Sequence, residues 1–393
     1  MGNYLSGKRL HSCSYLTLNL PIRLTGRKFE VDFITELQDI PLGLLVPLRI
    51  WYSAFLAGKK VDMDTIIITG ASGFLGRNLV RHLAAEHTTL LALGREAVRI
   101  DATTVDLRNV TSASYIYSPE GQLDVAALLQ RSGHAHTASL SIVHLAGVAH
   151  NRDAVQADFN AGITDFSKSV FEGARAWATA QVPDGTPDRK VQIVNLSSIA
   201  ARNPDVSARK MIAMYGRAKA KAESSLAAVC GDTISAVSLR PPAIWANDAP
   251  GAFAQLGRFI DRGIPLPFGA LRTRRASVEV STICSQIKKL LQSLEARPTQ
   301  SHNVLETADG NYTLPEMIAM LAASMDCKAR LFSVPPNLLR AGLHFFGKAE
   351  LIDQLFTELA VSENDVQNFL NRRASALPNI LMSDNVDRSE DLS

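Results

Sequence analysis

A tyrosine and a lysine lie four residues apart in the segment "YGRAK", at the start of a helical pattern. Tyr215 and Lys219 are therefore expected on one face of a helix. An ammonium group near a phenol stabilises the phenolate and lowers the tyrosine pKa towards neutrality, so that the tyrosine can act as a general base on a hydroxyl group. Surface tyrosines and lysines also match this spacing by chance, so the pair alone does not establish a catalytic site.

Two serines lie at the carboxyl end of a strand predicted over residues 191–197, in the segment "NLSSIA". Ligands bind at the carboxyl ends of the strands in parallel sheets. Ser197 and Ser198 are therefore placed where a hydroxyl can hydrogen bond to a reacting oxygen. The alternative is that both are ordinary loop serines.

Three glycines follow the most strand-like stretch of the chain, in the segment "TGASGFLG". Gly70 permits a tight turn, Gly73 lets a phosphate approach the backbone, and Gly76 lets the following helix pack close to the sheet. The N–H groups and the positive dipole end at the start of that helix favour a pyrophosphate. The glycine spacing is G-x-x-G-x-x-G, which differs from the G-x-G-x-x-G of classical dinucleotide-binding domains.

Apolar runs alternate with amphipathic helical stretches from about residue 64 onward. The runs lack polar alternation, which is typical of strands buried on both faces of a parallel sheet. This order predicts a doubly wound, Rossmann-like α/β fold with right-handed crossovers. The expected strands cover residues 65–69, 88–94, 103–107, 139–147, 191–197 and 233–241.

Four parts are expected along the 393-residue chain. Residues 1–62 form an N-terminal extension, and residues 63–245 form the dinucleotide-binding α/β domain. The strand signal fades after about residue 245, so residues 246–375 are expected to form a smaller, mainly helical substrate lobe that can interleave with the α/β domain. Residues 376–393 are polar and acidic, which predicts a disordered tail.

Composition narrows the classes of partner. The net charge of +3 is too small to indicate nucleic acid or an anionic membrane as the main partner. Four cysteines lie far apart without a CxxC pair, which predicts free thiols in a reducing compartment and no metal site. The start of the chain lacks the pattern of a secretory signal, so a cytoplasmic location is expected.

The N-terminal extension has two interpretations. Residues 40–58 are mainly apolar and are followed by Lys59 and Lys60, a pattern that suits an anchor at a membrane surface. Pro41 and Pro47 break helical continuity in this segment, which favours the other interpretation, a poorly ordered extension.

The glycine turn, the strand-end serine and the YxxxK pair occur here in the order seen in a known family. Together they resemble the extended short-chain dehydrogenase/reductase family of NAD-dependent epimerases and dehydratases. The stretch beginning "SLRPPAIWANDAPGAF" is similar to bacterial UDP-N-acetylhexosamine 4-epimerases and UDP-N-acetylquinovosamine 4-dehydrogenases (4-reductases) of polysaccharide biosynthesis. The likeness extends over roughly residues 64–372.

The resemblance implies NAD or NADP as the cofactor. Arg95 suits the 2′-phosphate of NADP and Glu96 suits the ribose of NAD, so the sequence leaves the choice open. The segment "VDLRN" matches the family's adenine-contacting Asp-Leu pair, and "HLAG" matches the loop beside the adenosine. The implied cofactor-binding residues are Gly70, Ser72, Gly73, Phe74, Leu75, Gly76, Arg95, Asp106, Leu107, Leu145, Ala146, Gly147, Tyr215 and Lys219.

The resemblance also implies a UDP-sugar substrate. A homodimer is one possible assembly, and the sequence leaves the oligomeric state open. The resemblance makes Ser198 the catalytic hydroxyl, Tyr215 the base and Lys219 a ligand of the nicotinamide ribose. It assigns Asn160 to substrate binding and Arg275 to the UDP phosphates. A guanidinium suits that role because it can bind phosphate in a bidentate way. A solvated basic loop is the alternative for Arg275.

The residues after Ser198 limit the reaction. A 4,6-dehydratase of this family has an Asp-Glu pair there to expel water, whereas this chain has Ile199 and Ala200, which cannot exchange protons. Dehydration is therefore excluded. Epimerisation and reduction at C4 use the same Ser198, Tyr215 and Lys219 and stay open, as does a non-catalytic NAD(P)-binding sensor or scaffold.

Overall fold

The computed structural model describes residues 23–25, 28–30, 65–84, 89–95, 109–135, 137–147, 155–180, 189–206, 210–296, 302–347, 352, 355–361 and 365–375. The chain divides into two compact units, Met1–Val61 and Asp62–Ser393. In the first unit, strands β1 (Arg23–Thr25) and β2 (Lys28–Glu30) pair antiparallel. The apolar segment 40–58 and the expected tail 376–393 lie outside the described residues.

The second unit is built on a seven-stranded, fully parallel sheet with the strand order β11-β8-β7-β6-β3-β4-β5. The order reverses between β3 and β6, as in a doubly wound fold. The expected Rossmann-like α/β class is therefore confirmed. The strands are β3 (Thr65–Thr69), β4 (Leu90–Gly94), β5 (Val110–Ser114), β6 (Ser139–His144), β7 (Lys190–Leu196), β8 (Ile234–Arg240) and β11 (His302–Glu306).

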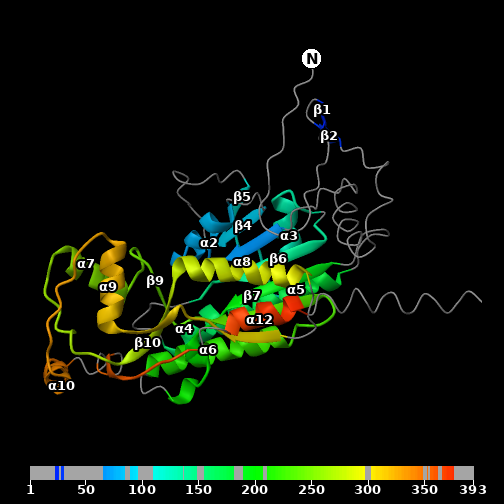
Figure 1. The fold of residues 1–393 in the computed structure, drawn as a ribbon. Helices are drawn as coiled ribbons and strands as arrows, with labels where there is room; N and C mark the ends of the chain where they lie inside the picture. Colours follow the sequence, from blue (N-terminus) through cyan, green and yellow to red (C-terminus); the bar gives the residue numbers. More distant parts are fainter. Residues whose placement is uncertain are drawn as a thin grey trace, which may run out of the picture. The chain divides into compact units, whose positions relative to one another are not determined.

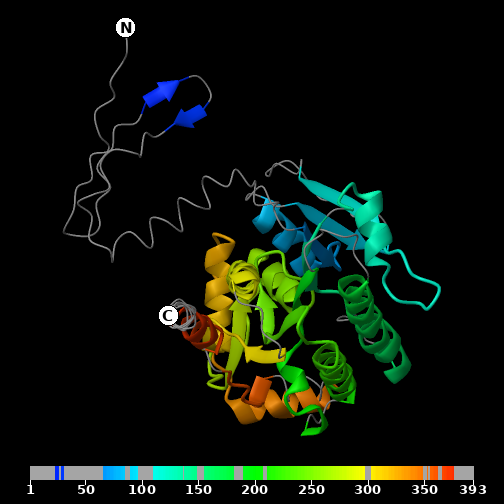
Figure 2. The ribbon, with the colours of Figure 1, turned by 90° about the vertical axis from the view of Figure 1, so that its right-hand side faces the viewer.

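Helices cover both faces of this sheet, which explains why its strands read as unbroken apolar runs. One core cluster joins the sheet to α2 (Phe74–Ala84), α8 (Val280–Ala296) and α12 (Asp365–Ser375). The other joins it to α3 (Val125–Arg131), α5 (Phe166–Thr179) and α6 (Lys210–Ala227). Helix α8 packs beside α2 (Figure 1), and α12, red in Figure 2, packs beside α8.

Five of the six expected strands are confirmed to within a few residues as β3, β4, β6, β7 and β8. The sixth, 103–107, lies outside the described residues. The strand beside β4 is β5, which the sequence analysis did not predict. Its sequence, VTSAS, is largely polar, because it forms an edge of the sheet and none of its residues is fully buried.

Strands continue beyond residue 245, where the strand signal in the sequence fades. A three-stranded sheet with the order β12-β10-β9 combines β9 (Ala243–Trp245), β10 (Arg274–Glu279) and β12 (Gly310–Thr313). Between β10 and β12 in the chain, β11 returns to the main sheet. These short strands lack an apolar run, since β10 begins with two arginines and β11 is only partly buried. The lobe also contains α7 (Ala252–Asp261), α9 (Leu314–Ser324) and α10 (Pro336–Phe345).

Within the described residues, no helix has both the length and the apolar character needed to cross a membrane.

Phe171 is a test of the packing between α5 and the sheet. Its side chain is fully buried, so Phe171→Ala should lower the free energy of unfolding by about 3–5 kcal/mol through lost burial and a cavity. Urea denaturation measures this loss. The matched control is Phe345→Ala, because Phe345 is 84% exposed and its loss should change stability by no more than about 0.5 kcal/mol. Equal losses in the two variants would contradict the described packing.

Candidate active site

The carboxyl edge of the main sheet brings together most of the candidate residues. Parallel strands all end at the same edge, so the turns that follow them are neighbours. The glycine turn follows β3, Arg95 follows β4, Leu145 follows β6, and Ser197 with Ser198 follows β7. Three strand spacings of about 4.8 Å separate β4 from β7, which spreads these groups over roughly 14 Å.

The glycine turn is tight and lies against the loop after β6. Gly70 has a positive φ of 69°, and a Cβ atom on it would lie 2.7 Å from the backbone nitrogen of Ala146. A Cβ on Gly76 would lie 2.3 Å from the carbonyl oxygen of Gly70. Glycine is therefore required at both positions. Ser72 and Gly73 are exposed at the start of α2, where backbone N–H groups have no partner within the helix and can bind an anion.

Tyr115 is a residue of this edge that the sequence analysis missed. It follows β5, and its hydroxyl oxygen accepts a hydrogen bond of 3.0 Å from the backbone N–H of Gly70. The same hydroxyl donates to the carbonyl oxygen of Leu93 at 3.4 Å. Burial raises the pKa of Tyr115, so it stays a neutral donor. Tyr115 and Gly70 are 45 residues apart in the chain, so no local sequence pattern predicts their hydrogen bond.

Asp106 and Leu107, the expected adenine contacts, lie outside the described residues. The register of the sheet nevertheless bears on their assignment. Strand β5 pairs with β4 from Val110 to Ser114, so the residues that follow its carboxyl end are Tyr115 and Ile116. Asp106 and Leu107 precede β5 in the chain, and their contact with adenine stays a prediction.

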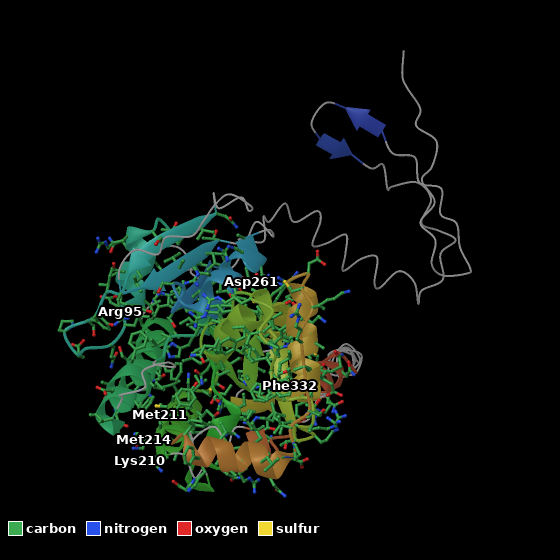
Figure 3. All side chains as sticks on the ribbon, turned by 90° about the vertical axis from the view of Figure 1, so that its left-hand side faces the viewer. Arg95, Lys210, Met211, Met214, Asp261 and Phe332 are labelled. Atoms are coloured by element: carbon green, nitrogen blue, oxygen red, sulfur yellow. The ribbon has the colours of Figure 1, made fainter. Side chains whose placement is uncertain are left out.

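Arg95 is exposed directly after β4, near Tyr115. Figure 3 places it near the β4–β5 side of the sheet, away from Met211 and Met214 on α6. Glu96 lies outside the described residues, so the choice between NAD and NADP stays open.

His144 fixes the strand that leads into the 145–147 loop. One ring nitrogen, Nδ1, lies 2.8 Å from the hydroxyl of Thr69, and the other, Nε2, lies 2.9 Å from the hydroxyl of Ser167. Burial, with a smaller contribution from the charge of Lys219, lowers the pKa of His144 to about 3. The imidazole is therefore neutral and links β3, β6 and α5.

Ser198, Tyr215 and Lys219 come together at the end of β7. The side chain of Ser198 lies near the Tyr215 hydroxyl and lowers its pKa. The ammonium of Lys219 lies 5.9 Å from the centre of the Tyr215 ring and donates to the carbonyl oxygen of Leu196 at 2.7 Å. A Cβ on Gly147 would lie 3.4 Å from the same ammonium, so the 145–147 loop also borders this group.

The expected lowering of the Tyr215 pKa does not occur in this structure. Burial raises the pKa of Tyr215 to about 12, and the hydrogen bond from Ser198 opposes this rise only in part. Burial also lowers the pKa of Lys219 to about 8, against the raising effect of Glu223. The sequence pattern gave the spacing of the pair but not its burial, and loss of solvation has the larger effect on both groups.

A buried ion pair supports the helix that carries these residues. Glu223, one turn beyond Lys219 on α6, accepts two hydrogen bonds from the guanidinium of Arg240, at 2.8 and 2.6 Å. The hydroxyl of Ser197 also contacts the Glu223 carboxylate. Ser197 is therefore a structural residue, which leaves Ser198 as the serine beside Tyr215.

Asn160 lies on a π-helical turn, Asn160–Asp165, between α4 (Gln156–Phe159) and α5. Its side-chain oxygen accepts a hydrogen bond from Gln156 at 3.0 Å. The ring of its neighbour Phe159 meets the Tyr215 ring edge-on, with centroids 6.1 Å apart. The turn thus borders the catalytic tyrosine candidate, and such turns often occur at functional sites.

Arg275 lies on the three-stranded sheet and not at the carboxyl edge of the main sheet. It lies on β10 and donates to the carbonyl oxygen of Thr357 at 2.6 Å. The next residue, Ala276, packs in a small core cluster with Ile199, so β10 runs beside the segment that follows Ser198. Successive side chains of a strand point to opposite faces, which turns Arg275 away from the Ile199 side.

The fold and the site agree with the comparison to protein families. The model of the NAD dependent epimerase/dehydratase family matches residues 66–265, about half of the chain. The chain belongs to this family. The matched region contains the glycine turn, Ser198, Tyr215 and Lys219.

Two characterised relatives differ in their named reactions. The chain is 23% identical over 318 residues to a UDP-glucose 4-epimerase of Vibrio cholerae, an alignment that covers 77% of this chain and 89% of that protein. It is 28% identical over 284 residues to a ceramide reductase of Caulobacter vibrioides, covering 70% of this chain and 76% of that protein.

Among solved structures, the human epimerase family protein SDR39U1 with NADPH is similar in fold. The TM-score is 0.50 at 13% identity, with 77% of this chain and 92% of that chain covered.

Two surface cavities, of about 530 and 470 Å³, lie on the lobe rather than at the strand ends. Neither is lined by Ser198, Tyr215 or Lys219. Over the described residues, no group of three or more His, Cys, Asp and Glu side chains could hold a metal ion.

The neutral state of His144 has a measurable effect on acid stability. Because its pKa is about 3 when folded and about 6.5 when unfolded, the unfolded chain takes up a proton first as the pH falls. Stability from this residue is therefore complete above about pH 6.5 and falls by about 1.4 kcal/mol per pH unit towards pH 3.

His144→Gln should remove this component, so the wild-type protein should lose about 2 kcal/mol more than the variant between pH 6.5 and 5. Urea denaturation at each pH measures the difference, with His344→Gln on the exposed α10 as the control. Parallel pH profiles for wild type and His144→Gln would contradict a buried neutral imidazole.

Proposed function

We propose that this protein is an NAD(P)-dependent nucleotide-sugar epimerase or oxidoreductase that acts at C4 of a UDP-hexose or UDP-N-acetylhexosamine in polysaccharide biosynthesis. The observation that supports this proposal best is the grouping of Ser198, Tyr215 and the buried ammonium of Lys219 at the end of β7. This set lies on the same sheet edge as the glycine turn, in a member of the NAD dependent epimerase/dehydratase family.

The strand ends fit an extended dinucleotide. The pyrophosphate would lie at the start of α2, where the required glycines leave the backbone accessible. Arg95 would contact the adenosine side, with Tyr115 holding the turn beneath it. Lys219 would contact the nicotinamide ribose, because its ammonium lies against Gly147 in the neighbouring loop. The cofactor would supply the acceptor and donor of hydride.

Ser198 and Tyr215 would handle the proton at the C4 oxygen. In the oxidising direction, the Tyr215 oxygen takes the proton of the C4 hydroxyl while the Ser198 hydroxyl holds that oxygen in place. In the reducing direction, the same tyrosine returns the proton. Ile199, buried directly after Ser198, offers no second acid or base, so the loss of water from the sugar is not expected.

The nucleotide-sugar substrate class is supported by the Vibrio cholerae relative, a UDP-glucose 4-epimerase. Asn160 would contact the sugar from the π-helical turn beside Tyr215. Arg275 would bind the UDP phosphates, which requires its guanidinium to exchange the carbonyl of Thr357 for a phosphate oxygen.

Reduction of a UDP-4-keto-6-deoxy sugar is the second candidate. Tyr215 is protonated at neutral pH and so carries the proton that ketone reduction requires, although its raised pKa makes it a weaker acid than an ordinary tyrosine. A relative named as a reductase, the ceramide reductase, adds support for this direction. A non-catalytic NAD(P)-binding sensor is the remaining alternative.

Incubation with UDP-N-acetylglucosamine, with and without NAD(P)H, separates these functions. A C4 epimer formed without added cofactor would establish an epimerase. Consumption of NAD(P)H only with a UDP-4-keto-6-deoxy sugar would establish the reductase. Tight dinucleotide binding without any product would overturn both and favour the sensor.

Tyr215→Phe should reduce turnover by about 10²–10⁴-fold, because the variant keeps the ring but loses the proton-transferring hydroxyl. Dinucleotide affinity, measured by fluorescence titration, should change little. Tyr117→Phe is the matched control, since Tyr117 is 49% exposed and outside the proposed catalytic set. Unchanged turnover in Tyr215→Phe would refute the catalytic assignment.

A further inference from the structure

Helix α10 turns an apolar face to solvent. None of its residues is buried, and Leu338, Phe345 and the C-capping Phe346 are 65%, 84% and 75% exposed. Residues 338 and 345 are seven apart and so lie on one side of the helix. Such a side normally packs against a core, and large exposed apolar groups mark a surface that binds a partner.

Other residues of the helix contact the rest of the chain. The guanidinium of Arg340 lies 4.6 Å from the centre of the Phe356 ring, a cation–π contact. Leu339 and Leu343 are only half-buried. The contacts of α10 with its own chain therefore leave the Leu338 and Phe345 side uncovered.

Two further large apolar residues are exposed in the segment that precedes α10. Leu331 and Phe332 are 36% and 48% exposed. Backbone hydrogen bonds from Leu266 to Arg330, at 2.8 Å, and from Phe332 to Leu266, at 3.0 Å, tie this segment to the loop after α7. Figure 1 shows α7, α9 and α10 gathered at the same end of the unit, and Figure 3 labels Phe332 on the face turned to the viewer. We call Leu331, Phe332, Leu338, Phe345 and Phe346 the α10 face.

Basic side chains accompany the α10 face. In segments 258–264 and 326–346, the exposed basic residues outnumber the exposed acidic ones, Asp261 and Asp326. Arg330 reaches the loop after α7, since a Cβ on Gly263 would lie 3.9 Å from its guanidinium carbon. The exposed basic residues are Arg258, Arg262, Lys328, Arg330 and Arg340.

We propose that the α10 face docks on the surface of an anionic phospholipid bilayer. Aromatic and aliphatic side chains that project from a helix enter the boundary between headgroups and acyl chains, while neighbouring basic groups bind the anionic headgroups. A second copy of this chain fits less well. A two-fold contact would bring the same basic residues of both copies together, and like charges repel.

Flotation of the full-length protein with vesicles tests the proposal. Phosphatidylcholine vesicles that contain phosphatidylglycerol should bind the protein, pure phosphatidylcholine should bind it less, and added salt should weaken binding. The triple variant Leu338→Ser, Phe345→Ser, Phe346→Ser should bind at least about tenfold more weakly. The matched control is Val155→Ser with Val304→Ser, at exposed apolar positions outside the α10 face.

A second measurement locates the contact, because the N-terminal segment also contains apolar and basic residues. Phe345→Trp should be quenched by brominated phospholipids in the vesicles, whereas Val155→Trp should not. Absence of wild-type binding, equal binding by the triple variant, or equal quenching at both positions would overturn the proposal. So would a wild-type dimer in solution that the triple variant converts to a monomer, since that result assigns the face to a second copy.

Discussion

The buried pair of Glu223 and Arg240 is the interaction on which the arrangement of the site depends. It joins the C-terminal half of α6 to the end of β8, and through Ser197 it also reaches the end of β7. Removing one partner of such a pair leaves a buried charge without compensation, which typically costs about 3–5 kcal/mol. The pair therefore fixes both the rotation and the height of α6 against the sheet. Lys219 and Tyr215 lie one and two turns before Glu223 and are positioned by it.

The same burial determines the chemistry that the site can perform. Lys219 and Tyr215 are both driven towards their neutral forms by loss of solvent. Tyr215 is neutral and lies beside Lys219, which has a pKa of about 8. A charged group that binds next to this pair would shift both pKa values and so determine which of the two side chains gains or loses a proton. The neutral imidazole of His144, two strands away from β8, adds no charge to this balance.

Local patterns in the sequence predicted much of the fold and the centre of the site. The glycine turn, Ser198 and the Tyr215–Lys219 pair are each visible within a few residues, and buried strands such as β3 stand out as apolar runs. Features that depend on distant contacts were not predictable in this way. Tyr115 acts through Gly70 across the sheet, β5 is polar because it forms an edge, and the pKa of Tyr215 depends on burial by several elements. Arg275 was identified by resemblance alone, and its side chain contacts the Thr357 carbonyl.

The late return of β11 to the main sheet has a consequence during synthesis of the chain. β11 pairs with β8 in the register His302 to Ala236. More than sixty further residues must therefore be synthesised before the outer edge of β8 can pair with its partner strand. At roughly 5–20 residues per second, that interval is about 3–13 seconds. During this time a strand with six fully buried residues in the finished protein presents an unpaired edge to other chains. The α10 face follows β11 in the chain, so it emerges from the ribosome only after the partner of β8 has been made.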